Sequence, residues 1–137
     1  QLLRVDEEVA LPCTPQSKKQ ILDAVEKLLP SCQVVVLSDY CKGLFTEDLS
    51  QTLIERIHHQ NKMIPIIVDP KGKDYGRYKG ATLITPNLKE LGEIAKHPIK
   101  SQEDIIQSSQ RLQNDFNIDA VLVTQGSQGM TLIDKDK

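Results

Sequence analysis

The sequence predicts an α/β fold, with a doubly wound, mainly parallel sheet and helices on both faces. Short apolar, β-branched runs alternate along the chain with amphipathic segments of helical period, an order typical of parallel sheets. Several of these runs are almost continuously apolar, which is typical of strands covered on both sides. With 137 residues, the chain has room for one core, so we expect residues 1–137 to form a single domain.

The first third of the chain supplies two predicted strands and two helices. Residues 2–9 (LLRVDEEV) carry four charges and are expected to form a short edge strand. Residues 14–30 are expected to form a helix whose apolar face consists of Ile21, Leu22, Val25, Leu28 and Leu29. A buried strand is expected next, at 33–38 (QVVVLS). Thr46 is the expected N-cap of the next helix. The buried stripe of that helix consists of Leu49, Leu53, Ile54 and Ile57.

Four more strands are expected between residues 63 and 134. Residues 63–69 (MIPIIVD) and 81–85 (ATLIT) read as buried strands, joined by a loop over 70–80 with at most one helical turn. The last two strands, 119–124 (DAVLVT) and 129–134 (GMTLID), are separated by QGSQ. This spacing predicts a tight hairpin.

Two helices are expected between the third strand and that hairpin. Residues 87–97 form the first, with an apolar face made of Leu88, Leu91, Ile94 and Ala95. Ser101 is the expected N-cap of the second helix, which turns Ile105, Ile106 and Leu112 inward.

Composition excludes several classes of function. The net charge is −2 and no basic stripe is present, so neither nucleic acid nor an acidic membrane is an expected partner. No apolar run approaches the roughly 20 residues of a membrane span. The three cysteines show no C-x-x-C spacing and fit a cytoplasmic protein. Because the chain starts at Gln1 and stops just after a hairpin strand, we expect it to be a piece of a longer protein.

Polar or glycine-rich chemistry follows four of the predicted strands immediately. The segments are 38–43 (SDYCKG), 69–72 (DPKG), 85–90 (TPNLKE) and 124–129 (TQGSQG). The carboxyl ends of parallel strands lie along one edge of a sheet, where ligands of open α/β sheets collect. Lysines and helix N-termini at such an edge suit a polyphosphate, because they neutralise charge and offer backbone N–H groups.

Each segment also has an ordinary structural interpretation. Asn87 and Glu90 form a good capping box, and 69–72 is a common turn sequence. The glycines of 124–129 suit any hairpin, and Lys42 could cover an apolar rim with its stem. The basic residues of the 70–80 loop suit a solvated face: Lys71, Lys73, Arg77 and Lys79. Asp39 is harder to dismiss, because a carboxylate at the end of a buried strand needs donors or a ligand.

Other catalytic templates are not found in the sequence. It contains no G-x-x-x-x-G-K-[ST], no G-x-G-x-x-G and no G-x-S-x-G. His58, His59 and His97 have no metal-ligand spacing to a cysteine, and all three are expected at the surface.

Three stretches, VVVLSDYCKG, IIVDPKGKDYGRYKGATLITPNLKEL and VLVTQGSQGMTLI, resemble the ribokinase-type (PfkB) carbohydrate kinases. Within this family they are most similar to the heptose 7-phosphate kinase domains. The resemblance covers essentially the whole chain and implies a partial ribokinase-like fold. It also implies transfer of the ATP γ-phosphoryl group to the anomeric hydroxyl of D-glycero-β-D-manno-heptose 7-phosphate. The product would feed ADP-heptose and lipopolysaccharide core synthesis.

The resemblance also implies roles for individual residues. The residues expected at the nucleotide and its phosphates are Asn87, Glu90, Thr124, Gly126, Gly129 and Lys71, with Glu90 meeting Mg²⁺ through water. The residues expected at the acceptor sugar are Asp39, Tyr40 and Lys42. The implied cofactors are ATP and Mg²⁺, the implied partner is a small-molecule sugar phosphate, and a homo-oligomer is compatible with the family.

The family's catalytic base is the Asp of a G-A-G-D motif, and these 137 residues contain no such motif. The N-terminal sugar-binding strands of the family, with their Gly-Gly motif, are missing as well. We therefore expect the parent protein to be a kinase and this segment alone to be inactive. Two alternatives stay open: another ribokinase-type sugar kinase, and a non-catalytic module that binds nucleotide or sugar phosphate.

Overall fold

The computed structural model of the chain describes residues 11–135. The edge strand expected at 2–9 lies outside this range. One five-stranded sheet forms the centre, in the order β1 (Val35–Ser38), β2 (Ile66–Asp69), β3 (Leu83–Ile84), β4 (Ala120–Thr124) and β5 (Met130–Asp134). Strands β1 to β4 are parallel, and β5 runs antiparallel to β4. This confirms the predicted class, a mainly parallel α/β sheet.

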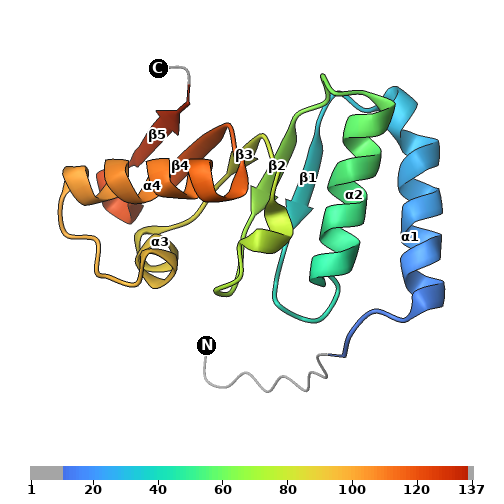
Figure 1. Ribbon diagram of the computed structural model, residues 1–137, viewed down its shortest axis with the longest axis horizontal. Helices are drawn as coiled ribbons and strands as arrows, with labels where there is room; N and C mark the ends of the chain where they lie inside the picture. The colour runs from blue at the N-terminus through green and yellow to red at the C-terminus, as the bar shows by residue number, and fades with distance from the viewer. Residues whose placement is uncertain (1–10, 136–137) are drawn as a thin grey trace.

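Three of the four described helices begin directly after the capping residues predicted for them. Figure 1 shows the helices beside the sheet. They are α1 (Pro15–Leu28), α2 (Glu47–Gln60), α3 (Leu88–Ala95) and α4 (Gln102–Phe116), with short 3₁₀ turns η1 (Leu29–Ser31), η2 (Gly76–Tyr78) and η3 (Gly126–Gln128). The side chains of Thr46, Asn87 and Ser101 each accept a hydrogen bond from the amide three residues later, as expected. None of the helices within 11–135 is long and apolar enough to cross a bilayer.

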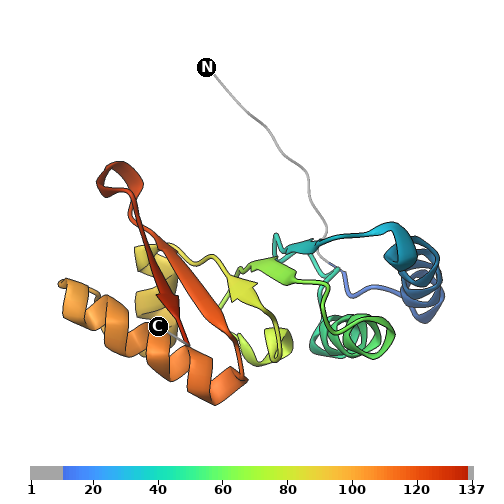
Figure 2. The same ribbon diagram turned by 90° about the horizontal axis from the view of Figure 1, so that it is seen from above.

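Only one face of the described sheet is covered by helices (Figure 2). A row of register partners crosses that face and is buried from edge to edge: Leu37, Val68, Ile84, Val121 and Ile133. On the opposite face, Val36 is 59% exposed and Leu132 is 58% exposed. The prediction placed helices on both faces. Because the strands follow one another without a reversal of order, each right-handed crossover within 11–135 returns to the same side.

Most residues of the predicted helical stripes lie in the core or pack against it. Ile106 and Ala95, predicted on buried faces, are half-buried and do not pack against the core, and one helix end also differs. Leu49, Leu53 and Ile54 of α2 are buried, as is Leu91 of α3. At the end of α1, however, the predicted pair Leu28 and Leu29 separates: Leu29 enters the core from η1, while Leu28 is 61% exposed. The two residues belong to different elements, because α1 ends at Leu28 and η1 begins at Leu29.

The loop between β2 and β3 contributes to the core, although its basic residues predicted a solvated face. Its turn η2 packs against α2, and Gln51 donates its side-chain amide to the carbonyl of Arg77 at 3.0 Å. Tyr75 and Tyr78 are fully buried, with their rings edge to face at 5.8 Å. The loop is therefore anchored by aromatic side chains close to the carboxyl ends of the strands.

Candidate active site

The four polar strand ends lie side by side along one edge of the sheet, as predicted. The amide of Asp39 donates to the carbonyl of Asp69 at 3.0 Å, and that of Thr85 donates to Val68 at 3.0 Å. Beyond β3, the amide of Thr124 donates to the carbonyl of Pro86 at 2.9 Å. These bonds continue the sheet ladder past its strands, so each segment directly adjoins the next.

An ion pair joins the second and third of these segments. The ammonium of Lys71 donates to the Oε1 atom of Glu90, whose Oε2 accepts the amide of Asn87 at 2.9 Å. Asn87 completes the capping box by accepting the amide of Glu90 at 2.9 Å. The hydrogen bond to Glu90 raises the pKa of Lys71 above its ordinary value. A cation is therefore held at the N-terminus of α3, where an anion would bind.

Asp39 finds its donors inside the chain. Its side chain is 2% exposed; Oδ1 accepts the amide of Cys41 at 2.7 Å, and Oδ2 accepts the hydroxyl of Tyr78. The period of two along a strand explains this direction, because Asp39 shares the helix-covered face with Leu37. The sequence left donors or a ligand as alternatives for this carboxylate, and the donors are present.

Tyr40 points the other way, and with Lys42 it lines a hollow. The hollow, of about 360 Å³, lies beyond the end of β1, and its remaining lining comes from Ser38, Asp39, Leu44 and Phe45. The Tyr40 side chain is 69% exposed. A phenol and an ammonium at a partly apolar hollow are suited to a small polar molecule that also carries a phosphate.

The fourth segment is built from backbone and glycine. The hairpin loop closes with the Gln125 amide donating to the carbonyl of Gly129 at 2.8 Å. Gly126 and Gly129 have φ angles of +62° and +90°, and no atom lies within 4 Å of where a Cβ would stand on either residue. Thr124, which bridges to Asn87, begins the loop. A ligand can thus approach this backbone closely, as phosphates do in glycine-rich turns.

Arg77 is the site residue that the sequence interpretation missed. It was grouped with exposed lysines, yet its side chain is 14% exposed and lies 3.5 Å from Oδ2 of Asp39. Its Nη1 donates to the carbonyl of Phe45 at 3.0 Å, and its Nη2 donates to that of Lys71 at 2.6 Å. The one available signal was the unpaired carboxylate of Asp39, which required a cation from elsewhere.

The described residues do not form a complete divalent-metal site by themselves. Within 11–135, no group of three or more His, Cys, Asp or Glu side chains is placed to hold a metal ion. Glu90 is the carboxylate beside the Lys71 ammonium, and both of its oxygens are engaged. These residues therefore fit an Mg²⁺ ion that is held through water and ligand phosphates.

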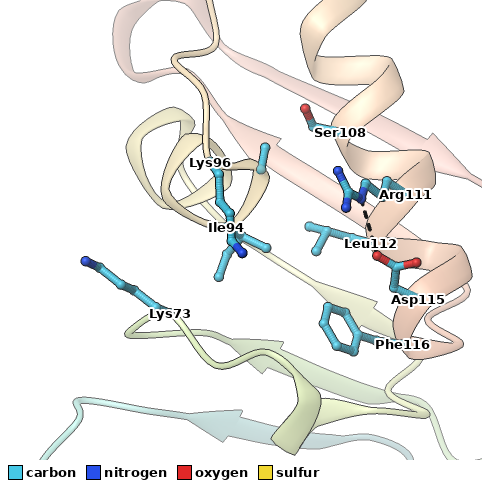
Figure 3. Close-up of a pocket in the computed structure, with 9 residues that line it drawn as sticks. Lys73, Ile94, Lys96, Ser108, Arg111, Leu112, Asp115 and Phe116 are labelled. Carbon is cyan, nitrogen blue, oxygen red and sulfur yellow. Dashed lines mark ion pairs between the residues drawn. The ribbon is translucent and has the colours of Figure 1, made fainter.

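A second hollow, of about 240 Å³, lies away from the strand ends, between α3, α4 and Lys73 (Figure 3). Arg111 on its wall pairs with Asp115 one helical turn away, at 3.5 Å. The histidines also lie apart from the site. His59 and His97 are exposed, while His58, expected at the surface, is half-buried, with Nε2 2.9 Å from the carbonyl oxygen of Gly80.

Comparisons with known proteins relate the chain to one family. The family described as pfkB family carbohydrate kinase matches residues 5–137. The bifunctional protein HldE of Paramagnetospirillum magneticum is 43% identical over 136 residues, which are 99% of this chain and 28% of that protein. The HldE of Yersinia enterocolitica is 38% identical over 138 residues, which are 100% of this chain and 27% of that protein. The chain thus spans little more than a quarter of the curated relatives it matches.

Solved structures show the same fold at lower identity. Phosphofructokinase-2 from Escherichia coli in complex with potassium superposes with a TM-score of 0.71 at 20% identity, over 92% of this chain and 41% of that one. Ribokinase from Arabidopsis thaliana, complexed with ribose and ATP, superposes with a TM-score of 0.68 at 20% identity. The match covers 84% of this chain and 36% of that one. With its family model matching nearly from end to end, the chain belongs to the pfkB family of carbohydrate kinases.

Proposed function

We propose that the chain is part of an ATP-dependent sugar kinase that phosphorylates the anomeric hydroxyl of D-glycero-β-D-manno-heptose 7-phosphate. The observation that carries the proposal is the continuous edge formed by 38–43, 69–72, 85–90 and 124–129, with the Lys71–Glu90 pair at its middle. HldE relatives at 36–43% identity support the heptose assignment.

In this proposal the edge is divided between the two substrates. Thr124, Gly126 and Gly129 offer backbone to the nucleotide phosphates, next to the N-terminus of α3. Tyr40 and Lys42 face the acceptor sugar from the hollow at the end of β1. Phosphoryl transfer depends mainly on positioning and charge neutralisation, and the side chains here supply both.

Lys71 lies between the two halves of the edge and faces the transferred phosphoryl group. Its ammonium is held by Glu90, so the charge is already placed before a ligand binds. Mg²⁺, when bound with ATP, would neutralise phosphate charge, and Glu90 would hold its water shell. The general base is not assigned among these 137 residues, which lack the family's G-A-G-D motif. We therefore propose that the segment alone does not turn over.

The test is ADP release by the full-length protein that contains this chain, offered ATP, Mg²⁺ and a panel of sugar phosphates. We expect heptose 7-phosphate to give the highest kcat/KM. Lys71→Met should lower kcat by at least about tenfold, because it removes a preplaced charge. Lys62→Met is the matched control, since Lys62 is exposed and precedes β2, outside the four segments of the edge.

Three results would contradict the proposal. Higher kcat/KM with a ketose phosphate or a gluconate derivative would reassign the acceptor. Nucleotide binding without turnover on any acceptor would indicate a binding module. Normal turnover by the isolated 137-residue chain would contradict its proposed inactivity.

A further inference from the structure

Arg77 contacts both loops that carry the proposed acceptor and phosphate contacts. One is the acceptor loop, residues 39–45, and the other is the lysine loop, residues 70–76. The guanidinium donates to the Phe45 carbonyl of the acceptor loop at 3.0 Å and to the Lys71 carbonyl of the lysine loop at 2.6 Å. A planar guanidinium holds two acceptors in fixed directions through different nitrogens, whereas the donors of an ammonium rotate about a single nitrogen.

Further contacts fix the guanidinium itself. Its Nη2 lies 3.5 Å from Oδ2 of Asp39 and 3.6 Å from the sulfur of Cys41, and its Cζ lies 5.1 Å from the centre of the Tyr78 ring. Tyr78 donates its hydroxyl to the same Oδ2 atom of Asp39. Asp39, Arg77 and Tyr78 thus form one buried cluster behind the edge, which we call the edge clamp.

Asp39 borders the hollow, but the clamp engages its carboxylate. Its carboxylate is 2% exposed and already accepts from Tyr78 and from the amide of Cys41. The neighbouring Tyr40 and Lys42, in contrast, are exposed at the hollow. What the clamp can transmit is position: the backbone it holds carries Tyr40 and Lys42 on one side and Lys71 on the other.

We propose that Arg77 is a positioning residue that couples the acceptor loop to Lys71, and that Asp39 acts through Arg77. This inference rests on the proposed function for its catalytic consequence, but the coupling itself does not. By fixing both loops, the clamp sets the distance between the acceptor hydroxyl and the charge that Lys71 and Glu90 supply to the phosphoryl group. A misplacement of about 1 Å in such an arrangement costs about a hundredfold in rate.

The experiment compares Arg77→Lys with Arg111→Lys in the full-length protein. Arg111 is a matched control because its side chain is 73% exposed and pairs with Asp115 of its own helix. Hydrogen exchange by mass spectrometry reports on the two loops, and steady-state kinetics with ATP and heptose 7-phosphate report on transfer. Tyr78→Phe is a second variant that keeps the buried ring and removes only the hydroxyl donated to Asp39.

We expect Arg77→Lys to speed exchange in both 39–45 and 70–76, with β2 to β4 unchanged. Lysine keeps the positive charge but lacks the planar guanidinium that binds both carbonyls. We therefore expect kcat to fall about tenfold to a hundredfold. The KM for ATP should stay within about twofold, because the nucleotide contacts lie at the other half of the edge. Tyr78→Phe should change loop exchange and kcat in the same direction as Arg77→Lys, but by less. Arg111→Lys should change neither.

Several outcomes would overturn the inference. Faster exchange in only one loop, or in neither, would show that the loops are not coupled through Arg77. Faster exchange in both with unchanged kcat would show a merely structural role. Full activity in Arg77→Lys would show that charge alone matters. If the wild-type protein phosphorylates no acceptor, the proposed function fails, and the exchange of the two loops then decides the coupling by itself.

Discussion

The two halves of the strand-end edge are built in different ways. At the ends of β1 and β2, buried side chains from distant parts of the chain tie the loops together, as Tyr78 does with Asp39. At the β4–β5 hairpin, the loop is closed by backbone hydrogen bonds, and its two glycines have open space around them. One half is therefore held in place by a side-chain cluster, and the other presents bare backbone.

This difference fits the demands of the two proposed substrates. A sugar must be placed with its hydroxyl in line for phosphoryl transfer, and a preorganised loop favours this placement. Nucleotide phosphates need close approach and N–H groups rather than shape. The comparison predicts that substitutions in the first half disturb folding and catalysis together, while those in the second half affect ligand binding with little loss of stability.

The largest effect is expected from Asp39→Ala. Removing the carboxylate leaves Arg77 and the Tyr78 hydroxyl buried without their shared acceptor. Breaking a buried pair in this way costs about 3–5 kcal/mol. Urea unfolding should show this loss, and Asp48→Ala, at an exposed position on α2, should stay close to wild type. A loss below about 1 kcal/mol, as for a surface pair, would mean that the clamp is not a stabilising unit.

The glycines allow a matched test of the two halves. Gly72 and Gly126 have φ angles of +81° and +62°, so alanine is strained by about 1 kcal/mol at either position. At Gly72, however, a Cβ would also lie 3.0 Å from Nη2 of Arg77 and 3.0 Å from the sulfur of Cys41. We expect Gly72→Ala to lower the free energy of unfolding more than Gly126→Ala. Gly126→Ala should instead weaken ATP binding, measured by calorimetry; the reverse ranking would contradict the comparison.

The two buried tyrosines should respond to phenylalanine with opposite signs. The Tyr78 hydroxyl donates to Asp39, whereas the Tyr75 hydroxyl is buried without a hydrogen-bond partner among the described residues. Tyr78→Phe should therefore cost about 1 kcal/mol, and Tyr75→Phe should stabilise by about as much. Equal changes in the unfolding midpoint would show that the Asp39 contact contributes nothing.

The last expected effect is a dependence on alkaline pH. Burial raises the pKa of Tyr75, and burial together with the hydrogen bond to Asp39 raises that of Tyr78, both above the ordinary 10.0. An unfolded chain releases these protons first, so the stability they contribute is complete below pH 10 and falls as the pH rises further. The unfolding midpoint should decline near about pH 11, and less steeply in Tyr75→Phe.

Local rules predicted much of this architecture from the sequence. The N-caps Thr46, Asn87 and Ser101 lie where side-chain chemistry places them, and the strand ends meet because parallel strands share an edge. The period of two along β1 was sufficient to turn Asp39 inward and Tyr40 outward, although the prediction grouped both as sugar contacts.

Long-range partners could not be predicted in the same way. Nothing in the pattern around Arg77 distinguishes it from Lys73 or Lys79, because its burial depends on Asp39, which lies 38 positions earlier in the chain. Likewise, nearly continuous apolar strands predicted helices on both faces, yet the face bearing Val36 is open within 11–135. Which helix covers which face depends on strand order, and strand order is not written in any one segment.

The most direct test of the account is a hydrogen-exchange footprint of the full-length protein with each ligand separately. Mg²⁺–ATP should protect 85–90 and 124–129, and heptose 7-phosphate should protect 38–43, with 69–72 protected in the presence of both. Protection of 38–43 by the nucleotide would contradict the division of the edge between a phosphate half and an acceptor half. So would a ligand that protects only segments outside the edge.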